Sequence, residues 1–129
     1  MRRRPTRGGS LIEAVVAAIF LIPIVLGMLD LVVMVMSSMD NDELAKNAAR
    51  AAASQPDQNT SYQAALNVVN RFKTSNTITS VNMDDFKYTQ NDSILVATKM
   101  KVCLPVEVAG WGHLTFVAQS VQPIVAPKQ

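Results

Sequence analysis

One apolar run near the N-terminus constrains this chain more than any other feature. Between Leu11 and Met36 only Glu13 and Asp30 are ionisable. An α-helix needs roughly 20 mostly apolar residues to cross the hydrocarbon core of a bilayer, and this run provides more than that. The sequence therefore predicts a transmembrane helix, followed by a soluble remainder of about 90 residues that can bury only a modest core.

Basic residues precede the apolar run. The only charges before Glu13 are those of Arg2, Arg3, Arg4 and Arg7. Because a basic segment resists crossing the membrane, we expect the N-terminus to stay cytoplasmic and the C-terminus to lie outside. A secretory signal peptide has the same order of basic and apolar segments. This apolar run is longer, however, and no small-x-small cleavage site with a polar continuation follows it.

Composition narrows the possible functions. The 129 residues include one Cys and one His, so neither a disulfide framework nor a cluster of Cys or His metal ligands is expected. A formal net charge of +2, with few basic residues after residue 8, does not indicate nucleic acid as a partner. No constellation of titratable side chains indicates catalysis. We therefore expect neither an enzyme nor a cofactor.

Glu13 stands near the start of the apolar helix, where an acid is costly unless it lies at the headgroups or is paired. One interpretation is an interfacial acid favoured by the helix dipole. Its neighbours suggest another, because the arginines, Gly8, Gly9, Glu13 and the apolar run together resemble the type IV pilin superfamily. That resemblance implies that a prepilin peptidase removes a leader, residues 1–8, by cutting after Gly8. It also implies that Glu13 then neutralises the new α-amino group of a neighbouring subunit.

Five residues further along resemble one branch of that superfamily, the TadE-like proteins of tight-adherence (Tad) pili: Pro23, Gly27, Asp30, Asn47 and Arg50. This resemblance implies a minor pilin or pseudopilin. Its partners would be the prepilin peptidase and other pilin subunits, and it would lie in the bacterial inner membrane or in an extracellular pilus. Ala14 stands where the major pilins of these systems usually have tyrosine, which favours a minor role.

A membrane protein that is never cleaved is the alternative hypothesis. It would cross the bilayer once and bind a partner through its outer domain, and it assigns no role to Glu13. Cleavage would change the charge of the chain. Loss of residues 1–8 removes four of the twelve basic side chains and leaves eight against ten acidic ones, so the mature net charge would be −2.

The residues after the apolar run predict an α+β fold. Nothing between Ser37 and Ser54 breaks a helix, so one helix is expected from about Ser10 to Ser54, loosened or kinked at Pro23 and Gly27. Its segments would be the membrane and assembly part, 9–36, and an extramembrane part, 37–56. Leu44, Ala48, Ala51 and Ala52 lie near one face, which could pack on the protein's own sheet or on neighbouring helices.

A small outer domain is expected over residues 57–129, with one short helix and an antiparallel sheet of about three strands. The expected elements are a helix over 62–73 and strands over 77–89, 93–104 and 114–121, and Val125 could extend the last strand past Pro123. Alternation is clearest in 93–104, where the even-numbered residues share one face that we expect to be buried. Asp84 and Asp85 mark a bulge or turn. Residues 105–113 are expected to form a loop, since glycines flank Trp111.

Three side chains near that loop are candidates for chemistry or contact. Cys103 and His113 would be separated by the loop, so we expect no catalytic pair, and Cys103 is interpreted as a small half-buried hydrophobic residue. A disulfide to another chain is its alternative role. Trp111 is interpreted either as an exposed contact point or as an anchor in the core.

Overall fold

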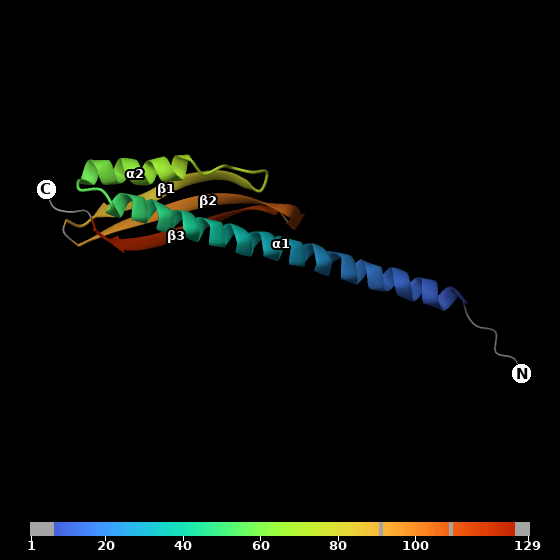
Figure 1. The fold of residues 1–129 in the computed structure, drawn as a ribbon. Coiled ribbons are helices and arrows are strands. Elements are labelled where there is room, and N and C mark those ends of the chain that lie inside the picture. The colour runs from blue at the N-terminus through green and yellow to red at the C-terminus, as the bar shows by residue number, and fades with distance from the viewer. Residues whose placement is uncertain (1–6, 91, 109, 126–129) are drawn as a thin grey trace, which may run out of the picture.

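The computed structural model describes residues 7–90, 92–108 and 110–125, and it has the expected α+β layout. In chain order its elements are α1 (Arg7–Ala53), α2 (Gln58–Asn70), β1 (Ile78–Tyr88), β2 (Ser93–Val108) and β3 (Trp111–Pro123). The strands form one antiparallel sheet in the order β1-β2-β3. α1 lies along one face of the sheet and extends well beyond it, while α2 lies at the β1 side (Figure 1).

α1 is one helix of 47 residues, about 70 Å long at 1.5 Å per residue. The long helix expected from the sequence is therefore confirmed, and it continues through Pro23. It ends at Ala53, three residues before Pro56. The last amides to bond back to its carbonyls are those of Ser54 and Gln55, and the ring of Pro56 has no N–H with which to continue the series.

β2 is the central strand, and its alternation agrees with the sequence pattern. Its even-numbered residues from Ile94 to Leu104 are all buried, which confirms the expected buried face. Ala97 of the opposite face is also buried, at 1% exposure. Beside it, the register of β1 against β2 shifts between Met83 and Asp85, so the expected irregularity near the two aspartates is confirmed as a bulge.

Three expected boundaries were wrong. The second helix ends at Asn70 and not at Lys73. It begins at Gln58 and not at Tyr62, because the carbonyl of Asp57 already accepts hydrogen bonds from the backbone of Ser61 and the hydroxyl of Thr60. Val125 does not extend β3. Its N–H instead bonds to the carbonyl of Ala53 at the end of α1, 3.1 Å away.

The expected loop over 105–113 was also wrong, because β2 and β3 continue through it to a tight hairpin in which Val108 pairs with Trp111. Pro105 is tolerated inside β2 because β1 pairs with β2 only as far as Val102, so no neighbouring strand on that side needs its missing N–H. Gly110 has a φ of +84°, which glycine adopts without strain.

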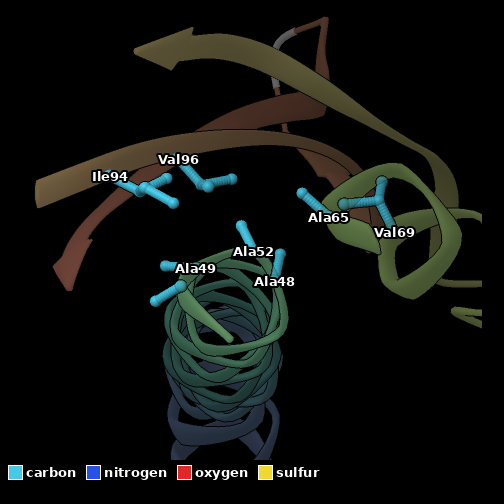
Figure 2. Close-up of a cluster of buried hydrophobic side chains, with 8 residues drawn as sticks. Ala48, Ala49, Ala52, Ala65, Val69, Ile94 and Val96 are labelled. Carbon is cyan, nitrogen blue, oxygen red and sulfur yellow. The ribbon is translucent and has the colours of Figure 1, made fainter. Parts of the chain in front are cut away.

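The core forms where α1 meets the sheet and α2. Figure 2 shows Ala48, Ala49 and Ala52 on the side of α1 that faces β2 and α2. The residues of this cluster are Ala48, Ala49, Ala52, Ala53, Ala65, Val69, Ile94 and Val96. The alanine face thus packs on the protein's own sheet. Ala51 is only half-buried, at the border of that face.

A cluster of buried polar groups fixes α1 on the sheet, on the N-terminal side of the alanines. Asn41 is 1% exposed, and its side-chain amide donates to the carbonyls of Thr98 at 3.4 Å and Phe116 at 3.2 Å. The hydroxyl of Thr98 donates in turn to the Asn41 Oδ1, 2.9 Å away. Since a buried amide without partners is costly, these bonds favour one register of the helix along β2 and β3.

Enlarging the alanine face should weaken the outer domain. We expect Ala49→Leu to lower the free energy of unfolding by about 1 to 3 kcal/mol, because overpacking forces the helix away from β2. Urea unfolding in detergent micelles, followed by circular dichroism, measures this change. Ala18→Leu is the matched control, since Ala18 is exposed on the projecting half of α1. Equal unfolding midpoints for the two variants would contradict the close packing of Ala49.

Candidate functional site

The projecting half of α1 is the largest apolar surface in the described part of the chain. Almost none of its apolar segment is buried. By length and composition this helix could span a membrane. Its large exposed apolar side chains are Leu11, Ile12, Val15, Val16, Ile19, Phe20, Leu21, Ile22, Ile24, Val25, Met28 and Leu29. Such a surface needs lipid or another protein to cover it.

Glu13 lies on this exposed surface, in the second turn of α1. The ion pairs within the described residues lie in the sheet, and none involves Glu13. Gly8 and Gly9 occupy the first turn of the helix, directly after Arg7. The rest of the expected leader, residues 1–6, lies outside the described residues. The exposed carboxylate is therefore free to meet a cation that comes from another molecule.

Asp30 marks the junction between the projecting half of α1 and the sheet. It is only 5% exposed, and its Oδ1 accepts a hydrogen bond from the backbone N–H of Val106 in β2, at 3.2 Å. This contact joins residues 76 positions apart in the sequence. A hydrogen bond to an ionised acceptor is stronger than one between neutral groups. Asp30 therefore ties the far end of the β2–β3 hairpin to the helix.

A bulge in β2 frees the amide that Asp30 binds. Cys103 pairs with His113 and Val108 pairs with Trp111, so β2 advances five residues while β3 advances two. The extra residues of β2, Val106 among them, have no partner in β3. The N–H of Val106 is therefore available to the carboxylate on α1.

Around this junction and beyond it, α1 has two different faces. The face toward the sheet includes residues at helical spacing that are buried or half-buried: Leu26, Asp30, Val33, Ser37 and Asn41. The face away from the sheet, which we call the free stripe, stays apolar and exposed at Leu31, Val32, Val35, Met36 and Met39. The exposed apolar surface of α1 thus continues past the point where the sheet begins to cover the other side.

The structure separates the other residues that carry the TadE-like resemblance. Pro23 and Gly27 lie on the projecting half of α1, and a side chain at Gly27 would meet no atom within 4 Å. Asn47 and Arg50 are exposed near the C-terminal end of the helix, where Asn47 lines a shallow groove of about 240 Å³ that Phe72 also lines. These four residues and Asp30 therefore lie at three separate positions along α1, too far apart to line one pocket.

Cys103 and His113 are brought together, in contrast to the expectation that a loop would separate them. They are direct partners across β2 and β3, because the strands continue beyond the expected loop. Cys103 is half-buried and His113 is exposed. No group of three or more potential metal ligands occurs among the described residues.

Asn41 and the structural role of Asp30 were missed at the level of sequence. The available signal was their spacing, since Asp30, Ser37 and Asn41 lie on the helical face that continues into Ala45 and Ala48. A polar residue on a face that leads into a buried alanine stripe predicts a buried hydrogen bond. The partner could not be predicted in the same way, because the amide of Val106 is freed only by the bulge in β2.

Removal of the Asp30 carboxylate should loosen the end of the hairpin. We expect Asp30→Ala to cost about 1 to 3 kcal/mol locally, as for a hydrogen bond to a charged group. The amide of Val106 should then exchange with deuterium at least about fivefold faster, since 1.4 kcal/mol corresponds to a factor of about ten. Asp40→Ala is the control, because Asp40 is exposed on the same helix. An unchanged exchange rate at Val106 would show that the hydrogen bond to Asp30 does not hold the end of the hairpin.

Comparisons with known proteins identify no relative of this chain. No protein-family model matches the chain, and no curated protein or solved structure matches it. What the projecting helix does must therefore be inferred from its own residues and their surroundings.

Proposed function

We propose that this chain is a pilin-like structural subunit, a minor pilin or pseudopilin of the tight-adherence kind. It is cut after Gly8 and assembles through α1 into a pilus or a related secretion apparatus. The observation that carries the proposal is the length of exposed apolar surface on α1. That surface runs from Leu11 to Met39, and the sheet covers one face of the helix only from about Asp30 onward.

The exposed surface is longer than a membrane anchor requires. The 29 residues from Leu11 to Met39 span about 43 Å, whereas the hydrocarbon core of a bilayer is about 30 Å thick. The excess lies in the free stripe, at the level where the sheet already packs against the opposite face of the helix. An exposed apolar stripe of this kind is more favourable when it packs on the helix of a second subunit than when it faces water.

The charge of Glu13 supports the same proposal. An exposed carboxylate in the apolar half of α1 is costly in lipid, and a nearby cation offsets that cost. A cut after Gly8 creates a new α-amino group on Gly9, and in an assembly of parallel helices this group lies near the Glu13 of a neighbour. Before the cut, the arginines of the leader hold the N-terminus on the cytoplasmic side.

Processing and the role of Glu13 can be tested in one experiment. In cells with an active prepilin peptidase, the mass of the membrane-bound chain should show loss of residues 1–8. Glu13→Ala should still be cut but should not enter assemblies recovered by chemical cross-linking, because the pairing charge is gone. Glu43→Ala is the control, since Glu43 is an exposed acid outside the apolar half. An intact Met1 terminus would favour the uncleaved single-pass protein instead.

The free stripe gives a second test. Met36→Glu should reduce cross-linking between subunits severalfold, because it places a charge where we expect another helix to pack. Insertion into the membrane should be unaffected, since the change lies beyond Asp30. Asn47→Glu introduces the same charge at an exposed position near the end of α1 and should assemble normally. Equal cross-linking of both variants would mean that the free stripe is not an interface.

A further inference from the structure

The end of the β2–β3 hairpin lies beside the apolar half of α1. The bond between Val106 and Asp30 fixes this position, and Val108 is two residues further along β2, about 7 Å at the usual strand rise. Leu26, one helical turn before Asp30 on the same face, is half-buried although its neighbours on α1 are exposed. The hairpin therefore reaches past Asp30 toward the N-terminus of the helix. In Figure 1 the joined ends of β2 and β3 point toward the projecting half of α1.

That position coincides with the edge of a bilayer around α1. The 21 residues from Gly9 to Leu29 form about 31 Å of helix, and the hydrocarbon core is about 30 Å thick. A bilayer that covers this segment ends at the level of Asp30. The end of the hairpin then lies where acyl chains give way to headgroups.

The residues of the hairpin end suit this boundary. The described residues there are Val108, Gly110, Trp111 and Gly112, and between Val102 and Pro127 of the sequence the only acidic, lysine or arginine residue is Glu107. Tryptophan is enriched at membrane–water interfaces, and the one tryptophan of this chain is Trp111. By contrast, the other end of the sheet carries Lys87 and Asp92, both exposed. The two ends of the sheet thus differ in polarity in the direction that a membrane would impose.

We propose that the end of the β2–β3 hairpin rests in the interfacial layer of the bilayer that holds α1, as a second point of contact with lipid. This inference depends on the proposed membrane-spanning role of α1. With two contacts, one through the helix and one through the hairpin, the sheet has a fixed tilt on the membrane surface. The hydrogen bond from Val106 to Asp30 joins the two contacts.

Trp111 supplies the test, because its fluorescence reports its surroundings without a label. The full chain is placed in phosphatidylcholine vesicles that contain lipids brominated either near the headgroup or near the end of the acyl chains. We expect the emission of Trp111 to be quenched strongly by the shallow bromines and weakly by the deep ones. Iodide in the water should quench it less than in urea-unfolded protein.

A matched control moves the single tryptophan to the opposite end of the sheet. In the double variant Trp111→Phe/Thr89→Trp, the tryptophan follows β1 at a position whose N–H bonds to the carbonyl of Ser93. Ser93 lies about 40 Å along β2 from Val106. Thr89 is exposed, so the new side chain needs no space in the core. Neither brominated lipid should quench this variant, whereas iodide should.

Flotation of the vesicles separates the two hypotheses. If the chain does not float with the lipid, the membrane role of α1 fails, and with it the basis of the inference. If it floats but Trp111 responds only to iodide, the hairpin is in water and the inference alone is wrong. If lipid fails to quench and iodide is also excluded, the hairpin end is covered by protein, which would overturn the lipid contact in favour of a second subunit.

Discussion

The packing of α1 on the inner face of β2 determines the rest of the molecule, because one continuous helix must serve two environments. Over its outer half the helix offers alanines and three buried polar groups to the sheet. Over its projecting half it offers apolar side chains in every direction. The change occurs near Asp30, close to the end of the sheet. Every functional proposal for this chain depends on where that boundary lies along the helix.

The polar groups in this contact determine the position of α1 along the sheet more than they stabilise the fold. Alanines allow a close approach between helix and sheet, but their uniform shape would tolerate a shift by one turn. Asn41 and Asp30 do not tolerate it, because each binds a particular backbone group of the sheet. Loss of such a bond leaves a buried polar atom unpaired, at a cost of about 1 to 3 kcal/mol. The helix therefore has one favoured register on the sheet.

Much of the fold could be predicted from the sequence, since its signals are local. The length of α1 followed from the absence of breakers between Ser37 and Ser54, and the buried face of β2 followed from alternation. The hairpin end could not be predicted, because Pro105 and Gly110 are typical of loops and only the pairing of the strands shows that both are accommodated. For the candidate site, the spacing indicated Glu13 and Asp30 as unusual acids, but only the tertiary contact distinguishes the exposed one from the buried one.

The alignment of α1 with the strands has a mechanical consequence. In Figure 1 the helix runs nearly along the length of the sheet, with its free N-terminal half pointing away. A pull on that half loads the contact with the sheet in shear, so the bonds of Asp30 and Asn41 and the packing of the alanines share the force. Contacts loaded in this way must fail together, whereas a helix that crossed the strands at a right angle could peel off one contact at a time.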